Sequence, residues 1–487
     1  MKKTDILICG AGPAGLGAAW RLTEQSRSQE CSIDWMLVDA GSNPGGMATS
    51  TDTDGFTWDL GGHVLFPHYA YFDEVLDKVV KDWVEVKPVR GAWMHDKFIP
   101  YPVQRNIRHF PKPVLEQCLG GLAFVSNSNN QNFNAENFEQ HLQQSFGQGL
   151  YKHFFKPLNL KMWGTDPKVM TAGWTQHRSG SKSSNVPTVD LQRIIDNIEN
   201  QRDDVAWSED TRIRYPAFGG TGAIWQGVAR QLPEENLQFN QSIVSINMSE
   251  RVATLADGNT VAYNHLFTSM PIDKLLNCIS DQPDLAHYAG RFEPARVDVV
   301  GVGIRGMCPD ELKDLCSIYL PDESISFWRA TVLSNYSSSM SPEGTWSILC
   351  EINSGPARVP EKNPVESVIE DLIRLGFISR DNVVTSWHRH LEYGYPVPTL
   401  ERDSTLAEIQ PILESNGIYS RGRFGGWKYE VCNQDHAFMQ GVEVVDLLTV
   451  GAEEITYQIT APRQPEIATV NVNSAVNTQL HSNTNAA

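Results

Sequence analysis

The chain has 487 residues, of which 40 are Lys or Arg and 58 are Asp or Glu, so its formal net charge is −18. Proteins that bind nucleic acid or anionic membranes without specificity carry a basic excess, so this acidic balance argues against both kinds of partner. The composition, 41% hydrophobic and 20% charged, is typical of a soluble globular protein. The length predicts two to four domains.

The eight cysteines are scattered along the chain, without a Cys-x-x-Cys pair or a Cys/His cluster. This pattern predicts a reducing, cytoplasmic location and no metal site. No apolar stretch reaches the length of about 18 residues that a membrane span needs. The sequence therefore predicts a protein without a membrane segment.

Three predicted elements begin the chain: a buried strand over residues 5–9, a helix over 13–22 and a second strand over 35–39. The turn between the first two reads Gly10-Ala11-Gly12-Pro13-Ala14-Gly15. Its first glycine permits the turn, its second lets the backbone approach a pyrophosphate, and its third lets the helix pack close to the strand. Asp39 ends the second strand, where its carboxylate can accept hydrogen bonds from a ribose. Together these residues predict a dinucleotide site.

Two further glycine motifs follow. Pro44-Gly45-Gly46-Met47-Ala48 supplies a second turn suited to close passage beside a pyrophosphate. Asp59-Leu60-Gly61-Gly62-His63 places two glycines before a histidine, so the backbone could lie against a flat ring while His63 offers it a hydrogen bond.

The rest of the chain divides into a helical and a β-rich part. Residues 105–205 are predicted to be mostly helical, because apolar residues recur at helical spacing over 138–146 and again over 191–198 behind a cap at Asp190. Asp257-Gly258 predicts a hairpin turn, and 266–271 a further buried strand. Residues 290–400 contain short β-rich runs, such as 297–304 and 346–352, which predict an antiparallel sheet. Residues 126–134, 179–185 and the tail after 464 are polar and low in complexity.

The glycine turns, the acidic strand end and the hairpin resemble the FAD-binding domain of glutathione-reductase-like flavoproteins. Six later blocks, in order, resemble those of the UDP-galactopyranose mutases of the eukaryotic type. They are 101–104 (YPVQ), 154–163 (FFKPLNLKMW), 215–225 (YPAFGGTGAIW), 327–336 (FWRATVLSNY), 394–402 (GYPVPTLER) and 420–436 (SRGRFGGWKYEVCNQDH).

The resemblance implies an α/β fold with a Rossmann-like FAD-binding domain, a helical domain and a six-stranded antiparallel sheet. The expected boundaries are 1–90, 205–285 and 418–463 for the FAD-binding domain; 105–204 for the helical substrate domain, with a mobile loop near 178–187; 91–104 and 286–417 for the sheet domain; and 464–487 for a polar tail.

The implied activity is the interconversion of UDP-galactopyranose and UDP-galactofuranose, without net oxidation. In that family, N5 of reduced FAD attacks the anomeric carbon and UDP is the leaving group, so the cofactor acts as a nucleophile. NADPH or NADH would reduce the flavin beforehand. The implied partners are a UDP-sugar and, in some members of the family, further copies of the same chain.

The candidate residues follow from the blocks. A leaving pyrophosphate needs fixed positive charge and hydroxyl donors, which favours Arg329 with Tyr319, Tyr395 and Tyr429. Arg178 resembles the family's mobile-loop arginine, and with His63 and Arg329 it completes the expected catalytic set. The resemblance implies substrate contacts for Tyr101, Gln104, Phe154, Asn159, Trp163, Tyr336 and Arg423. It implies cofactor contacts for Gly10, Gly12, Ala14, Gly15, Asp39, Gly45, Gly46, Met47, Gly61, Gly62, His63, Val244, Arg423, Asn433 and Gln434.

The chain departs from the family pattern at Val103, Leu158, Asp210 and Cys432. A carboxylate at position 210 beside a pyrophosphate would be repelled unless Arg212 or Arg214 paired with it. These departures leave two alternatives open: the same chemistry on another nucleotide sugar, and an amine-oxidase-like flavin oxidoreductase.

Overall fold

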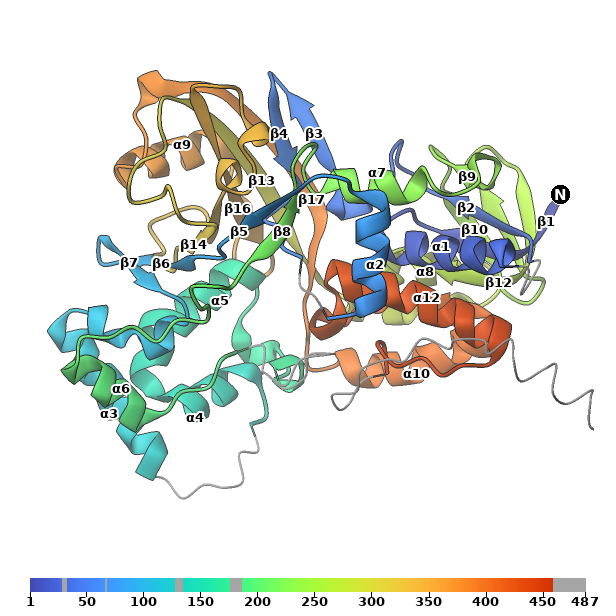
Figure 1. The fold of residues 1–487 in the computed structure, drawn as a ribbon. Coiled ribbons are helices and arrows are strands. Elements are labelled where there is room, and N and C mark those ends of the chain that lie inside the picture. The colour runs from blue at the N-terminus through green and yellow to red at the C-terminus, as the bar shows by residue number, and fades with distance from the viewer. Residues whose placement is uncertain (29–32, 66–67, 128–134, 176–185, 459–487) are drawn as a thin grey trace, which may run out of the picture.

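A computed structural model describes residues 1–28, 33–65, 68–127, 135–175 and 186–458 (Figure 1). A seven-stranded sheet is built around β1 (Lys2–Cys9), which pairs in parallel with β2 (Trp35–Val38) on one side and β12 (Thr260–Thr268) on the other. The sheet continues in parallel to β9 (Leu237–Gln238) beside β2 and to β18 (Ile418–Ser420) beside β12; β10 (Ile243–Asn247) and β11 (Val252–Leu255) add an antiparallel edge. The predicted Rossmann-like α/β fold is confirmed.

Two helices pack backbone to backbone beside this sheet. They are α1 (Pro13–Arg27) and α12 (Gln434–Val450), which lie next to one another in Figure 1 although more than 400 residues separate them. A Cβ at Gly17 would come within 2.2 Å of the Phe438 carbonyl oxygen, and one at Gly441 within 2.0 Å of the Ala14 oxygen. Only glycine permits this approach, so the glycines of α1 position the N-terminal end of α12 near the turn after β1.

A second seven-stranded sheet has the order β17-β13-β16-β15-β14-β6-β7. Its strands are β6 (Arg90–Met94), β7 (Lys97–Pro100), β13 (Pro294–Arg305), β14 (Ser317–Tyr319), β15 (Arg329–Val332), β16 (Thr345–Ser354) and β17 (Val383–Pro396). Every neighbouring pair is antiparallel except β6 with β14. The predicted antiparallel sheet is therefore present, but it has seven strands instead of six and one parallel pairing.

The helical part contains α3 (Lys112–Asn127), α4 (Phe138–Leu150), α5 (Lys156–Trp163) and α6 (Leu191–Glu199), with a π-helical turn over Tyr151–Phe155. The cap predicted at Asp190 is confirmed, because its side chain accepts a hydrogen bond from the Arg193 N–H. In Figure 1 these helices lie at the opposite side of the molecule from β1.

The remaining elements connect these parts. They are β3 (Ser50–Thr53) paired with β4 (Phe56–Asp59), β5 (Trp83–Val86) paired with β8 (Ile213–Pro216), and the helices α2 (Ala70–Val79), α7 (Gly222–Ala229), α8 (Ile272–Cys278), α9 (Pro364–Arg374), α10 (Arg402–Ser415) and α11 (Gly422–Gly425). No helix in the described ranges is both long and apolar enough for a membrane span.

The hairpin predicted at Asp257-Gly258 is confirmed, since it joins β11 to β12. The separate strand predicted over 266–271 is wrong. β12 runs without interruption from Thr260 to Thr268, pairing with β11 at its start and with β1 over most of its length. A single long strand that pairs with two different strands along its length can show the sequence pattern of two short strands.

Candidate active site

A cavity of about 960 Å³ runs between the β1 sheet, the second sheet and the helical part. Its wall contains most of the residues that the sequence singled out: Gly10, Gly12, Ala14, Asp39, Gly46, Met47, Gly61, Gly62, His63, Tyr101, Gln104, Phe154, Asn159, Tyr319, Arg329, Tyr336, Tyr395, Arg423, Tyr429, Asn433 and Gln434. Residues from all parts of the chain therefore meet at a single site.

The turn after β1 forms one end of the cavity. Gly10 has φ +107°, and a Cβ there would lie 2.2 Å from the Ser269 Oγ; a Cβ at Gly15 would lie 1.8 Å from the Gly10 oxygen. Gly12 differs, because no described atom lies within 4 Å of its would-be Cβ. The turn is thus compact on its protein side and open on its cavity side, which suits the approach of a pyrophosphate.

Asp39 stabilises the glycine turn at this end of the cavity. Its two carboxylate oxygens accept hydrogen bonds from the backbone N–H groups of Ala11 and Gly41, each at 2.6 Å. Burial raises the pKa of Asp39, and these two donors oppose the rise. The carboxylate therefore braces the glycine turn while it also faces the cavity.

The second glycine turn lies against the first. The Gly45 N–H donates to the Ala11 carbonyl oxygen at 2.8 Å, and a Cβ at Gly46 would lie 3.2 Å from the Gly12 Cα. Gly45 and Gly46 both have positive φ, +114° and +55°. The two motifs, more than thirty residues apart in the sequence, therefore form one cradle.

The loop after β4 brings His63 to the middle of the cavity. Gly61 has φ +135°, and the Gly62 N–H donates to Glu351 Oε1 at 3.0 Å. The His63 Nδ1 is buried and has no hydrogen-bond partner among the described residues. Burial lowers the pKa of His63 to about 4, so the imidazole is neutral at pH 7.

A buried ion pair joins the two central strands β15 and β16. Arg329 Nε and Nη2 lie 2.8 and 2.5 Å from Glu351 Oε1. The Tyr395 hydroxyl donates to Glu351 Oε2 at 3.2 Å. Burial alone would lower the pKa of Arg329, but the charge and hydrogen bond of Glu351, together with Tyr395 and Tyr319, outweigh burial and raise it. Arg329 is therefore protonated and held in a fixed orientation at the cavity wall.

Arg423 supplies a second cation. Its Nε and Nη2 donate to the Gly394 carbonyl oxygen at 3.2 and 3.0 Å, and its Nη1 lies 3.0 Å from Cys432 Sγ. Its Cζ lies 4.9 Å from the centre of the Tyr395 ring. Protein groups thus orient this guanidinium from three sides, and the Cys432 side chain occupies one of its donors.

Aromatic rings line the end of the cavity next to the helical part. The Tyr101 and Tyr319 ring centres are 6.3 Å apart, and Tyr319 stacks on Trp328 at 5.9 Å. Gln104 lies at this end, where its Nε2 donates to the Pro187 carbonyl oxygen at 2.8 Å. Gln104, which the resemblance implies as a substrate contact, is therefore partly engaged by the segment that follows residue 185.

Four predicted contacts lie off the wall. Trp163 is fully buried, donates to Asn159 Oδ1 at 3.2 Å and packs against the Tyr429 ring, so it supports the wall from behind. Gly15 and Gly45 shape the turns without lining the cavity. The Val244 side chain is 52% exposed, whereas its neighbours 241–243 line the cavity.

Arg178 and Asp210 are two further positions that the sequence singled out. Arg178 lies outside the described residues, as does nearly all of the loop expected near 178–187. Asp210 is exposed and away from the cavity wall; Arg212 donates to backbone oxygens and Arg214 pairs with Asp77 at 2.5 Å. Asp210 is therefore not placed to repel a pyrophosphate bound in the cavity.

Sequence reasoning missed Glu351 and Arg90. Glu351 is the only charged residue in the apolar strand Thr345–Ser354, and a lone carboxylate in such a strand was a usable signal. Arg90 begins β6, where its Cζ lies 4.9 Å from the Tyr101 ring centre and its buried Nε lacks a partner among the described residues. It had no comparable signal, because many strands begin with a basic residue.

Two sequence comparisons relate the chain to known proteins. Residues 8–79 match the family model of the NAD(P)-binding Rossmann-like domain. A probable UDP-galactopyranose mutase of Klebsiella pneumoniae is 26% identical over 179 residues, which is 35% of this chain and 44% of that protein. The match to this curated relative thus spans less than half of its length.

Two solved structures extend the comparison to nearly the whole chain. A putative protoporphyrinogen oxidase from Exiguobacterium sp. 255-15 is 13% identical, covers 92% of this chain and 99% of its own, and has a TM-score of 0.69, which shows a shared fold alone. The crystal structure of a reduced UDP-galactopyranose mutase is 37% identical, with a TM-score of 0.88. That match covers 93% of this chain and 97% of the mutase. The chain therefore belongs to the UDP-galactopyranose mutase family.

Proposed function

We propose that this protein is a flavin-dependent isomerase that interconverts UDP-galactopyranose and UDP-galactofuranose. The observation that carries the proposal is the meeting of the dinucleotide cradle, the His63 loop and the Arg329–Glu351 pair in one cavity, within a chain 37% identical to a UDP-galactopyranose mutase. An oxidase acting on an apolar amine has no need of two oriented guanidinium groups in its cavity, whereas a diphosphate leaving group does.

The residues present fit FAD. The open side of Gly12 would receive the pyrophosphate, and Asp39 lies where an adenosine ribose would follow. Gly61, Gly62 and His63, the residues expected beside a flat ring, line the same cavity. When bound and reduced, FAD would supply the nucleophilic nitrogen that displaces UDP from the anomeric carbon.

The chain's own groups would hold the leaving UDP. Arg423 and Arg329 offer charge-assisted hydrogen bonds to phosphate oxygens, and Tyr319 and Tyr429 add hydroxyl donors around them. The Tyr395 hydroxyl would join them by turning its proton from Glu351 to a phosphate oxygen. Because Glu351 balances the charge of Arg329, much of that guanidinium's value lies in its fixed geometry. Arg178 is proposed to add a further cation when substrate binds.

The uridine would lie between the aromatic rings of the other end. Tyr101 and Phe154 offer stacking surfaces, and the Gln104 carboxamide reaches the same region. The neutral His63 ring can offer a hydrogen bond to the flavin, because burial removes its charge at pH 7.

We further propose NADPH or NADH as the reductant that prepares the flavin. The cycle itself returns the electrons to the cofactor, so the reductant would be consumed once per activation and not once per turnover. The cytoplasmic location, the boundaries of the three domains and of the polar tail, and assembly into a homo-oligomer remain predictions from the sequence.

The test is chromatography of products from dithionite-reduced protein incubated with UDP-galactopyranose, UDP-galactofuranose and a panel of other UDP-sugars. We expect the two galactose isomers to interconvert, without conversion by oxidised protein. Turnover of a different UDP-sugar alone would redirect the substrate assignment. Amine oxidation with stoichiometric oxygen uptake would refute the mutase.

A further inference from the structure

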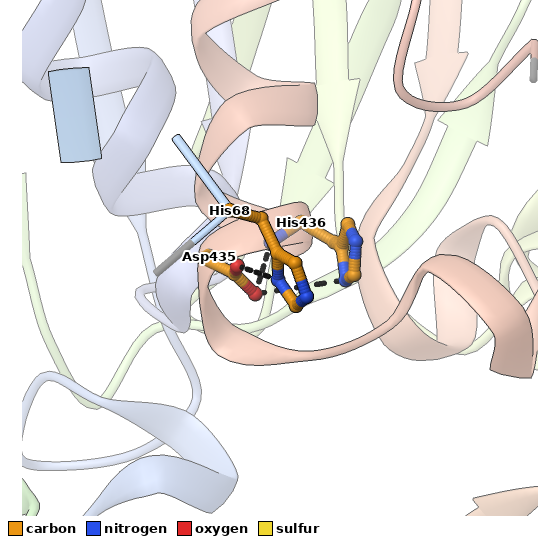
Figure 2. A group of neighbouring side chains, drawn as sticks. All are labelled: His68, Asp435 and His436. Atoms are coloured by element: carbon orange, nitrogen blue, oxygen red, sulfur yellow. Dashed lines mark hydrogen bonds and ion pairs between the residues drawn. The ribbon is translucent and has the colours of Figure 1, made fainter. Parts of the chain in front are cut away.

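Three ionisable side chains meet behind the wall of the cofactor cavity. His68 Nδ1 lies 2.5 Å from Asp435 Oδ2, and His436 Nδ1 lies 3.5 Å from Asp435 Oδ1. Figure 2 shows the His68 imidazole between the Asp435 carboxylate and the His436 ring. The Asp435 and His436 side chains are buried, and that of His68 is 11% exposed. No local sequence pattern announces this group, because His68 and Asp435 are 367 positions apart.

The group joins two segments that both line the cavity. Residues 61–64 form one stretch of the wall, and His68 follows them along the chain. Asn433, Gln434 and Ala437 form another stretch at the start of α12. Asp435 and His436 are absent from the described wall and face His68 instead. The His68–Asp435 pair, with the ring contact of Tyr69 and His436 beside it, therefore connects the His63 loop to the N-terminal turn of α12 on the far side.

Physical chemistry makes this contact strong. Burial alone would raise the pKa of Asp435, but the neighbouring His436 and His68 hold it below its usual range. The carboxylate lies in the first turn of α12, where helix N–H groups favour a negative charge, and it accepts the His436 N–H at 2.9 Å. A hydrogen bond from His68 to an ionised, buried carboxylate is charge-assisted.

Two imidazoles and one carboxylate are also a ligand set for a divalent cation. The ring geometry opposes that role. The His68 and His436 rings are stacked, 4.9 Å apart with planes inclined by 23°. A shared metal ion must lie in the plane of both rings, and near-parallel stacked rings do not direct two lone pairs at one nearby point. The arrangement is that of an ion pair with a stacked second imidazole.

We propose that His68 and Asp435 are positioning residues, which hold the His63 loop and the start of α12 at the separation that FAD requires. The inference rests on the proposed cofactor, and it adds residues that touch neither FAD nor sugar. Its prediction is that breaking the contact loosens the cavity wall from behind, so FAD binding weakens although every wall residue is intact.

The experiment titrates FAD into the deflavinated full-length protein, followed by quenching of flavin fluorescence. His68→Gln and Asp435→Asn keep the size of each side chain and remove the charge assistance. We expect each to raise the Kd for FAD about tenfold, which corresponds to about 1.4 kcal/mol. Because the two residues form one contact, the Kd of the double variant for FAD should be no higher than the Kd of the single variant that binds FAD less tightly. Asp435→Glu, which keeps the charge, should restore part of the affinity.

His109 and Asp203 provide a control. They form the same kind of pair, with His109 Nε2 2.8 Å from Asp203 Oδ1, and neither residue is on the described cavity wall. His109→Gln and Asp203→Asn should therefore leave the Kd for FAD within about twofold of the parent value. Thermal melting of each apoprotein checks that the variants fold.

The outcomes separate the two proposals. A parent protein that binds no FAD refutes the proposed function. A parent that binds FAD, with His68→Gln and Asp435→Asn binding equally well, overturns only the positioning role. Additive losses in the double variant, equal losses in the control pair, or a stoichiometric zinc ion in the purified protein would also overturn it.

Discussion

Removing the charge of Arg329 should damage stability and substrate binding by separable routes. In Arg329→Met the Glu351 carboxylate, whose side chain is only 2% exposed, loses its ionic partner. Breaking a buried pair from one side costs about 3–5 kcal/mol. Glu351 keeps the hydrogen bonds from the Gly62 N–H and the Tyr395 hydroxyl, so we expect a loss near the lower end, about 3 kcal/mol.

The double variant Arg329→Met/Glu351→Gln isolates the cause. The glutamine keeps an acceptor for the Gly62 N–H and no longer buries a charge, so at least half of the lost stability should return. UDP affinity should not return, because a guanidinium hydrogen bond to phosphate contributes about 1.5–3 kcal/mol and is absent from both variants. Urea unfolding monitored by tryptophan fluorescence gives the first quantity and calorimetric titration of UDP the second.

A free energy of unfolding for Arg329→Met within about 1 kcal/mol of the parent value would refute the cost of leaving Glu351 unpaired. A further loss of stability on adding Glu351→Gln would refute it too, since the cost would then not come from an unpaired carboxylate. Recovery of UDP binding in the double variant would show that Arg329 does not contact the diphosphate.

Three further predictions test the cofactor end. Gly12→Val should leave the apoprotein folded, since no described atom crowds the new side chain. It should weaken FAD binding at least about tenfold in the fluorescence titration, because the side chain would enter the place of the pyrophosphate. Gly120→Ala in α3, where a new side chain is equally uncrowded, should not change FAD binding. Asp39→Ala frees the Ala11 and Gly41 N–H groups at the turn and should cost about 1–3 kcal/mol in urea unfolding; an unchanged midpoint would contradict its bracing role. His63 has a folded pKa of about 4 against 6.5 when unfolded, so the unfolded apoprotein binds more protons between these values, and stability should fall as the pH drops from about 6.5 toward 4. His63→Phe should remove about 2 kcal/mol of that loss at pH 5, and an unaltered pH profile would refute a neutral, buried imidazole.

Three local features show how much the sequence could predict. The Gly10–Gly15 turn, the strand ending at Asp39 and the cap at Asp190 were all predicted from neighbours along the chain. Their structures depend on positive φ, on close approach of adjacent backbone, or on a side chain that reaches an N–H three residues away. Such interactions lie within a few residues, so a linear pattern contains them.

Long-range geometry accounts for what prediction missed. The number of strands in the second sheet, the double pairing of β12 and the position of Trp163 behind Tyr429 depend on which distant segments become neighbours. A tryptophan in a helix has the same local pattern whether it lines a cavity or supports its wall. Only packing distinguishes the two, because burial is a property of all surrounding residues together.

By itself, the sequence determined the chemistry that this protein could hold: a dinucleotide turn, a histidine after two glycines, and cationic and phenolic side chains in blocks typical of one family. The tertiary structure decided which charges act together. Glu351 pairs with Arg329 across two strands, and Asp435 pairs with His68 across most of the chain. An ion pair depends on the distance between charges in space, and that distance is set only when the chain has folded.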